Sequence, residues 1–202
     1  GLGDVYKRQV MACRCQKILA PAMNTAMYEN PVVQDNIRKL QTYGYEVITP
    51  ASGYLACGDT GAGKMPEPET LLEYILKEAA FQKDLAGKKL LVTAGPTQEA
   101  IDPVRCLTNH SSGKMGYAIA KMAMLRGAEV TLVSGPTAIE PPLFVKVVPV
   151  TSARDMFEAV TGLSDEQDII IKAAAVADYR PKQVSEDKVK KKDDQASIEL
   201  ER

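Results

Sequence analysis

Lys89-Leu-Leu-Val-Thr93 and Glu129-Val-Thr-Leu-Val133 decide the fold class, because both are short apolar runs rich in β-branched residues. Two further runs of this kind follow, Val145-Lys-Val-Val148 and Ile169-Ile-Ile171. Nearly continuous apolar strands that alternate with helices are typical of a parallel sheet covered on both faces. The sequence therefore predicts an α/β fold, with ligands binding beyond the carboxyl ends of the strands.

Two helices are predicted between these strands. The first should start just after Ser112 and gather five apolar residues on one face: Met115, Ala118, Ile119, Met122 and Ala123. The second should run from Thr151 to Gly162, with Thr151 or Ser152 as its N-cap. Its inward residues should be Met156, Phe157 and Val160. The polar stretch from Thr93 to Ser112 contains Gly and Pro and is predicted to be a loop.

The first eighty residues show a similar alternation. Lys17–Pro21 and Tyr45–Thr49 are predicted strands, and Asn30-Pro31 should begin a helix between them, because Asn caps and Pro suits the first helical position. Pro50–Pro68, rich in Gly and Pro, is predicted to be a long loop. A helix over Glu69–Gln82 should place Leu72, Ile75, Leu76 and Ala79 on one face.

The polar break Asp84-Leu-Ala-Gly-Lys88 is the expected domain boundary. Residues 1–10 have neither an initiator Met nor a signal-peptide pattern, and we expect them to be a non-native leader. Residues 11–83 and 84–202 should form two Rossmann-like parallel-sheet domains, each incomplete, because both ends of the sequence look cut.

Composition excludes several classes of protein. With 25 basic and 26 acidic residues in 202, the chain lacks the basic excess of a general nucleic-acid binder. No apolar run has the ~20 residues that a membrane helix needs. Four scattered cysteines do not make a disulfide framework and indicate a reducing compartment, so we expect a cytoplasmic protein.

Two nucleotide-binding patterns fail on inspection. Gly58-Asp-Thr-Gly-Ala-Gly-Lys64 has P-loop spacing, but Met65 stands where that loop needs Ser or Thr, and Pro66 and Pro68 oppose the helix that should follow. Only Gly95 lies near the end of the Lys89–Thr93 strand, so the glycine fingerprint of NAD sites is missing.

Two polar side chains in the first half are suited to chemistry. Asn24 follows the first strand, where its amide could bind a carboxylate or amide ligand, or instead satisfy the backbone of its own loop. Cys57 lies in a Gly-rich loop, where an accessible and mostly protonated thiol could donate a proton, although a lone Cys is usually a small core residue.

The motifs around these residues carry a resemblance. Pro21-Ala-Met-Asn-Thr-Ala-Met-Tyr28 and Ala56-Cys-Gly-Asp-Thr-Gly-Ala-Gly-Lys-Met-Pro-Glu-Pro68 resemble the flavin-dependent phosphopantothenoylcysteine decarboxylases. Other segments resemble the phosphopantothenate–cysteine ligases: Val92–Glu99, Asp102–Arg105, Asn109–Gly116, Ala173–Tyr179 and Lys188–Lys191. A decarboxylase followed by a ligase is the order of the bacterial bifunctional enzymes of coenzyme A biosynthesis.

For the decarboxylase, the resemblance implies FMN-dependent oxidation of phosphopantothenoylcysteine at its thiol, loss of CO₂, and reduction of the enethiol to phosphopantetheine. Asn24 would bind the carboxylate and amide region of the substrate, and Cys57 would donate the proton. The family's His and most of its FMN contacts have no counterpart in these residues, since His110 is the only His and lies in the ligase motif. The fragment should therefore not decarboxylate alone.

For the ligase, the resemblance implies that phosphopantothenate attacks CTP, with Mg²⁺ as a cofactor, and that cysteine then displaces CMP. Lys172, Ala173, Ala174 and Asp178 would line the nucleotide site. Lys188 would neutralise triphosphate charge, and Asn109 would handle the acyl-cytidylate. A homo-oligomer is expected at full length, without nucleic-acid or membrane partners. The alternatives are a non-catalytic FMN-binding or regulatory subunit and, less favoured by the missing fingerprint, an NAD-dependent oxidoreductase.

Overall fold

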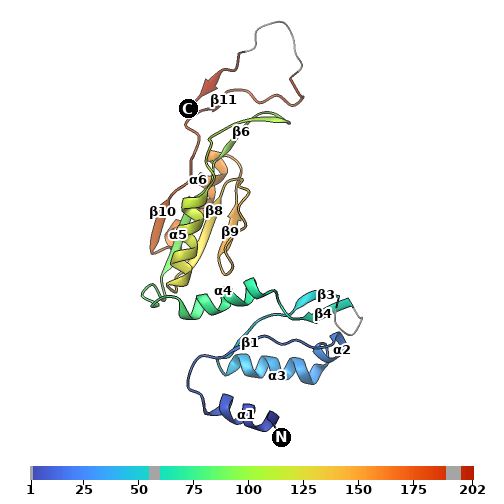
Figure 1. Ribbon diagram of the computed structural model, residues 1–202. Coiled ribbons are helices and arrows are strands. Elements are labelled where there is room, and N and C mark those ends of the chain that lie inside the picture. Colours follow the sequence, from blue (N-terminus) through green and yellow to red (C-terminus); the bar gives the residue numbers. More distant parts are fainter. Residues whose placement is uncertain (1, 55–59, 190–196) are drawn as a thin grey trace. The chain divides into compact units, whose positions relative to one another are not determined.

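The computed structural model describes residues 2–54, 60–189 and 197–202. Contacts divide the chain into two units, Gly1–Glu78 and Ala79–Arg202, which are coloured blue to cyan and green to red in Figure 1. The N-terminal helix α1 (Leu2–Ala12) belongs to the first unit. Each unit is described by itself.

The second unit is built on a parallel four-stranded sheet. Its strands are β5 (Lys89–Ala94), β8 (Glu129–Ser134), β9 (Lys146–Pro149) and β10 (Ile169–Lys172). Their order is β10-β5-β8-β9, so the first strand along the chain has the second on one side and the fourth on the other. This is the strand order of half a Rossmann fold, and the predicted α/β fold class is confirmed.

Two helices cover opposite faces of this sheet. Successive side chains of a β-strand point to opposite faces of the sheet, so Leu91 and Ala94 of β5 point to opposite sides. Leu91 packs with Met156 of α6 (Ala153–Leu163), whereas Ala94 lies against Gly116 of α5 (Lys114–Leu125). The β5 strand is therefore buried on both faces, which is why its sequence is apolar almost throughout.

The predicted inward faces of the helices are partly wrong. In α5 the sheet covers Gly116, Tyr117, Ala120, Ala123, Met124 and Leu125, while Met115 is 71% exposed and Met122 is 43% exposed. In α6, Met156 is buried as predicted but Phe157 is 68% exposed. A helix with many apolar residues offers more than one apolar stripe. In α5, the stripe with the small residues faces the sheet, because Gly and Ala allow the two backbones to approach closely.

Replacing Gly116 by Ala should destabilise the second unit. The added Cβ would lie 2.5 Å from the Ala94 Cβ and 2.9 Å from the Thr93 carbonyl oxygen, so the helix must move off the sheet. Overpacking of this kind costs about 1–3 kcal/mol of unfolding free energy, measurable by urea denaturation. Gly162→Ala in α6 is the matched control. Its Cβ would meet nothing within 4 Å, and it should stabilise by about 0.5–1 kcal/mol. A neutral Gly116→Ala would contradict the close packing.

After α1, the first unit continues with a βαβ arrangement. Strands β1 (Ile18–Leu19) and β2 (Glu46–Val47) pair in parallel, and α2 (Thr25–Tyr28) and α3 (Pro31–Thr42) connect them. The predicted start of α3 is confirmed, because the Asn30 side chain accepts a hydrogen bond from the Val32 N–H and Pro31 occupies the first helical position.

Two hairpins lie where loops were predicted. One joins β3 (Ala51–Tyr54) to β4 (Thr60–Lys64), and the other joins β6 (Gln98–Asp102) to β7 (Arg105–Thr108). Both loop predictions are wrong because these strands are short, contain Gly or charged residues, and lack an apolar run. Their strand conformation comes from antiparallel pairing rather than from side-chain pattern.

The remaining elements complete the two units. Helix α4 (Pro68–Ala79) belongs mainly to the first, and its predicted apolar stripe is not buried, since Leu72 and Ile75 are each 51% exposed. The second contains the short helix η1 (Ser164–Glu166) and the strand pair β11 (Arg180–Pro181) and β12 (Leu200–Glu201). None of the described helices is long and apolar enough to span a membrane.

Candidate functional site

The carboxyl ends of β5 and β10 form the switch point of the sheet. These strands are neighbours, although they are the first and last strands of the sheet along the chain. The loops that leave them meet at once: Pro96 bridges Ala175, the Thr97 N–H donates to the Ala175 carbonyl (3.2 Å), and the Ala175 N–H donates to the Gly95 carbonyl (2.9 Å). Ligands of open α/β sheets bind at such a switch point, and residues predicted to line the nucleotide site lie here.

Two buried threonines fix the loop that follows β10. The Thr93 Oγ1 accepts hydrogen bonds from the N–H groups of Ala173 (3.1 Å) and Ala174 (3.2 Å). The Thr97 Oγ1 accepts one from the Ala177 N–H (2.9 Å), and its side chain is fully buried. Neither threonine was predicted from the sequence to have a role. A polar residue at the end of a buried strand was the available signal.

These hydrogen bonds limit what the alanines can do. Because the N–H groups of Ala173, Ala174 and Ala177 already donate to threonine hydroxyls, they do not form a nest for phosphate oxygens. The small methyl side chains can instead let a ligand approach the loop closely. Ala173 and Ala174 are both half-buried, and Ala174 also packs against the core formed by Leu91, Val133 and Met156. A nucleotide could therefore contact only the surface that they leave exposed, and not their N–H groups.

Asn109 is brought to the same loop. It follows β7, and its Nδ2 donates to the Ala175 carbonyl (3.1 Å) and to the Val176 carbonyl (3.4 Å). Its side-chain oxygen stays available as an acceptor, because an amide has separate donor and acceptor atoms. The structure thus brings together Asn109 and the Ala173–Asp178 loop, which are far apart in the sequence.

Asp178 lies beside a pocket of about 510 Å³. The pocket is lined by Glu99, Ala153, Arg154, Phe157, Ala177, Asp178, Tyr179, Arg180 and Arg202. Glu99 is buried and its carboxylate accepts a hydrogen bond from the Ala153 N–H (2.8 Å) at the start of α6. The N-terminus of α6 is therefore already occupied by a carboxylate and by the Ser152 capping box.

The N-terminus of α5 differs, because its N-cap residue is Gly113, which has no side chain to cap it. The Ser111 and Ser112 hydroxyls accept only long hydrogen bonds, from the N–H groups of Gly113 (3.4 Å) and Lys114 (3.5 Å). Gly113 lies at the N-cap in the left-handed region (φ 77°), where a Cβ would lie 2.8 Å from the Thr137 Cγ2. A second pocket, of about 530 Å³, lies here and is lined by Ser111, Ser112, Lys114, Pro136, Thr137, Ala138 and Ile139. A helix start held only by these two long serine contacts, next to a lysine, suits an anionic group.

Lys172 and Lys188 have different settings. Lys172 ends β10 directly beside the switch point, paired in register with Thr93, and is exposed. Lys188 is also exposed, and no described residue forms a hydrogen bond or ion pair that joins it to the Ala173–Asp178 loop.

In the first unit, Asn24 and the β3–β4 hairpin lie together. The Met23 N–H donates to the Gly63 carbonyl (3.0 Å), and a Cβ on Gly61 would lie 2.6 Å from the Thr25 Oγ1. Asn24 itself caps α2 by accepting a hydrogen bond from the Ala26 N–H (2.8 Å). Cys57 lies outside the described residues, in the connection between the paired ends Tyr54 and Thr60. The hairpin brings the two sequence motifs of this unit close together.

The sequence with P-loop spacing, Gly58–Lys64, ends in a β-strand. Lys64 lies in β4 and donates to the Glu67 carboxylate (2.8 Å), and this hydrogen bond and the positive charge lower the pKa of Glu67 below its ordinary value. A strand at this position, in place of a loop that leads into a helix, confirms that the spacing does not make a phosphate-binding P-loop.

Comparison with known proteins supports the resemblance seen in the sequence. A family model described as DNA/pantothenate metabolism flavoprotein C-terminal domain matches residues 85–202. The chain belongs to this family. A second model, described as flavoprotein, matches residues 4–80. The flavoprotein match thus precedes the pantothenate-metabolism match along the chain.

Individual proteins that are similar to this chain have names that fit this family. The coenzyme A biosynthesis bifunctional protein CoaBC of Vibrio vulnificus strain YJ016 is 50% identical over 196 residues, 96% of this chain and 48% of that protein. CoaBC of Bacillus subtilis strain 168 is 46% identical over 202 residues, 98% of this chain and 50% of that protein. A crystal structure of a CoaBC C-terminal domain aligns with a TM-score of 0.51 at 59% identity, over 58% of this chain and 55% of that chain. This chain spans about half the length of these curated relatives.

Proposed function

We propose that this chain is part of a bifunctional enzyme of coenzyme A biosynthesis. Its second unit would take part in the CTP-dependent ligation of 4'-phosphopantothenate with cysteine, and its first unit in the FMN-dependent decarboxylation of phosphopantothenoylcysteine to 4'-phosphopantetheine. The observation that carries the ligase proposal is the junction of Asn109 with the Ala173–Asp178 loop at the sheet switch point. The relatives named coenzyme A biosynthesis bifunctional protein CoaBC support a bifunctional role in this biosynthesis.

In the ligase reaction the carboxylate of phosphopantothenate attacks the α-phosphate of CTP, and pyrophosphate leaves with the electrons of the broken P–O bond. The amine of cysteine then attacks the acyl-cytidylate and displaces CMP. Ala173 and Ala174 would pack against the nucleotide, with Lys172 and Asp178 at its edge. The Asn109 side-chain oxygen would orient the acyl-cytidylate. Lys188 would stabilise the negative charge that develops on pyrophosphate.

Mg²⁺ has no protein cage in the described part of the second unit. No three His, Cys, Asp or Glu side chains come together among the described residues. A Mg²⁺ ion that accompanies CTP would therefore be held by triphosphate oxygens and water, as is common for this ion. We assign it no residue of this chain.

For the decarboxylase, bound FMN would supply the two-electron oxidation of the substrate thiol. The described helices α2 and α3 do not fit its phosphate, because Asn24 and Asn30 already cap their N-termini, and we assign no FMN contact to them. Asn24 would bind the substrate carboxylate beside the β3–β4 hairpin. Cys57, as a protonated thiol, would give its proton to carbon during reduction of the enethiol.

We place the enzyme in the cytoplasm, as a homo-oligomer at full length. The described cysteines, Cys13, Cys15 and Cys106, are free thiols, which suits a reducing compartment. The proposed substrates are three small anions, phosphopantothenate, CTP and phosphopantothenoylcysteine, together with cysteine.

A nucleotide titration tests the proposal. It uses this chain extended to the full length of its relatives, here called the extended protein. CTP should bind saturably and more tightly than ATP, and NADH should not bind. A protein that binds FMN but neither CTP nor ATP would favour a non-catalytic flavin subunit instead. Binding of NADH would favour an oxidoreductase. Either result would overturn the ligase assignment.

A further inference from the structure

We propose that Asp102 is a positioning residue for Lys188, because its buried carboxylate holds the backbone of the next residue, Val189. This inference rests on the proposed ligase function and adds a residue to it. Asp102 ends β6, and its side chain has no exposed surface. The Oδ2 atom accepts hydrogen bonds from the Val189 N–H (3.1 Å) and from the Arg105 guanidinium (2.9 Å).

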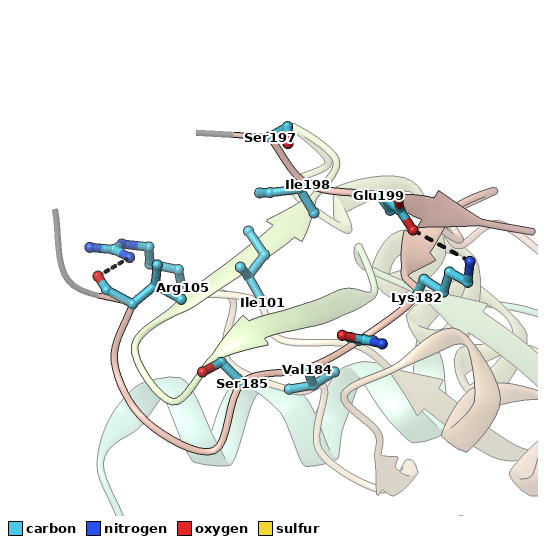
Figure 2. Close-up of a pocket in the computed structure, with 10 residues that line it drawn as sticks. Ile101, Arg105, Lys182, Val184, Ser185, Ser197, Ile198 and Glu199 are labelled. Atoms are coloured by element: carbon cyan, nitrogen blue, oxygen red, sulfur yellow. Dashed lines mark hydrogen bonds and ion pairs between the residues drawn. The ribbon is translucent and has the colours of Figure 1, made fainter. Parts of the chain in front are cut away.

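Val189 is held from both sides. Its N–H donates to Asp102, and its carbonyl accepts a hydrogen bond from the Arg105 Nη1 (3.1 Å). Slightly upstream, the Ser185 N–H donates to the Ile101 carbonyl (3.0 Å). The segment from Ser185 to Val189 is thus fastened to the β6–β7 hairpin at two points, and Figure 2 shows Arg105, Ser185 and Ile101 around the space that it encloses.

The Asp102 carboxylate forms a local turn with one oxygen and binds a distant segment with the other. The Asp102 Oδ1 accepts a hydrogen bond from the Val104 N–H (2.9 Å), which is an Asx turn. That turn needs one oxygen only, and the second oxygen reaches the distant Val189. Burial raises the pKa of Asp102, but the Val104 and Val189 hydrogen bonds and the Arg105 charge outweigh it and leave the pKa below its ordinary value. The anchor is therefore ionised at neutral pH.

Charge around Lys188 makes such an anchor necessary. Lys188–Lys192 holds four lysines, but Glu186, Asp187, Asp193 and Asp194 supply four acids. The long-range attraction of this stretch for a triphosphate is therefore weak. The backbone must therefore place the Lys188 ammonium near the triphosphate. Consecutive Cα atoms are only about 3.8 Å apart, so fixing Val189 limits where Lys188 can lie. The exposed Lys188 side chain remains able to turn towards a ligand.

The pocket beside this anchor does not supply a separate anion site. It measures about 660 Å³, and its two cations already have partners. Arg105 is paired with Asp102, and Lys182 with Glu199 at 3.4 Å, an ion pair drawn in Figure 2. The residues around this pocket therefore hold the Lys188 segment in place rather than bind an anion.

Asp102→Asn in the extended protein is the test. Asn can keep the Asx turn with its side-chain oxygen, but its NH₂ group then faces the Val189 N–H, two donors together. Amide hydrogen exchange at Val189 should become faster. The rate constant for the single turnover that releases pyrophosphate from CTP and phosphopantothenate, measured without cysteine, should fall about 10- to 100-fold, and the CTP concentration that gives half of the maximal rate should change little. A purely structural role would lower thermal stability and leave this rate constant per folded molecule unchanged.

Asp168→Asn is the matched control. Asp168 also accepts a hydrogen bond from a backbone N–H, that of Lys89 (2.8 Å), and pairs with Lys88 (3.2 Å), but it lies at the opposite end of the sheet. It should leave pyrophosphate release unchanged. If Asp102→Asn does not fold, Val189→Pro removes the N–H donor instead and should slow pyrophosphate release by the same factor. Pyrophosphate release at the wild-type rate in the folded anchor variant overturns the inference. Absence of release from the wild-type protein overturns the proposed function itself.

Discussion

Replacing Lys188 by Gln is expected to abolish cytidylate formation in the extended protein while leaving its fold intact. The side chain is exposed and contributes nothing to the core, so the substitution should not alter stability. It removes the one charge that the anchored segment would deliver to the departing pyrophosphate. Loss of a group that stabilises charge only in the transition state typically costs about 100- to 1000-fold in kcat. Pyrophosphate release from CTP and phosphopantothenate without cysteine isolates this half-reaction.

Lys192→Gln is the control for bulk charge. It makes the same change of charge outside the K-x-K-K pattern, at a residue that lies outside those the structure describes. If the lysine run acts only through bulk charge, affinity for the polyanion follows the net charge. Both variants should in that case lose the same amount of activity. The specific role of Lys188 requires that Lys192→Gln costs little. Equal losses would mean that the lysine run acts only as bulk charge, and the role of Lys188 would be withdrawn.

The central sheet could be predicted because its strands carry their own signal. Leu90, Leu91 and Val92 are buried on both faces, and selection for burial leaves an apolar run that is visible in one dimension. The β6–β7 hairpin carries no such run. Its strands are fixed by antiparallel pairing and by the Asp102 turn, which depend on partners rather than on local pattern.

The candidate site was predicted as separate segments, but not as an arrangement. Motif resemblance pointed to Asn109 and to Ala173–Asp178, whereas the hydrogen bonds that Thr93 and Thr97 accept from that loop could not be inferred. Each joins residues about 80 positions apart, and nothing in the sequence says which buried hydroxyl will face which N–H. The same holds for Asp102 and Val189, 87 positions apart. Long-range polar pairs follow from the fold and are invisible before it.

Asn24 shows that the two interpretations of a loop asparagine are compatible. The structural interpretation is confirmed, because Asn24 caps α2. The proposed binding role uses the same amide and stays a prediction. A substitution that keeps the cap and changes the charge can separate the two roles, and Asp is such a residue because Asn and Asp cap helices about equally well.

Asn24→Asp should therefore keep the fold and prevent decarboxylation in the extended protein. The new carboxylate can still accept the Ala26 N–H, as the Asn24 side chain does at 2.8 Å. It would also place a negative charge against the substrate carboxylate. Two like charges about 4 Å apart repel by about 4 kcal/mol at an effective dielectric constant near 20, so turnover at fixed substrate should fall on the order of 100-fold or more. The measurement is CO₂ release from phosphopantothenoylcysteine, with thermal unfolding measured in parallel.

Asn30→Asp provides the matched control for Asn24→Asp, because Asn30 caps α3 in the same way, accepting the Val32 N–H at 2.9 Å. It should leave both stability and CO₂ release unchanged. Cys57→Ser adds a second contrast, since a weaker proton donor should still allow CO₂ release but stall at the enethiol, before phosphopantetheine forms. Asn24→Asp must block the earlier step, because it acts on substrate binding. Normal CO₂ release by Asn24→Asp would leave Asn24 as a helix cap alone, and normal phosphopantetheine formation by Cys57→Ser would exclude Cys57 as the proton donor.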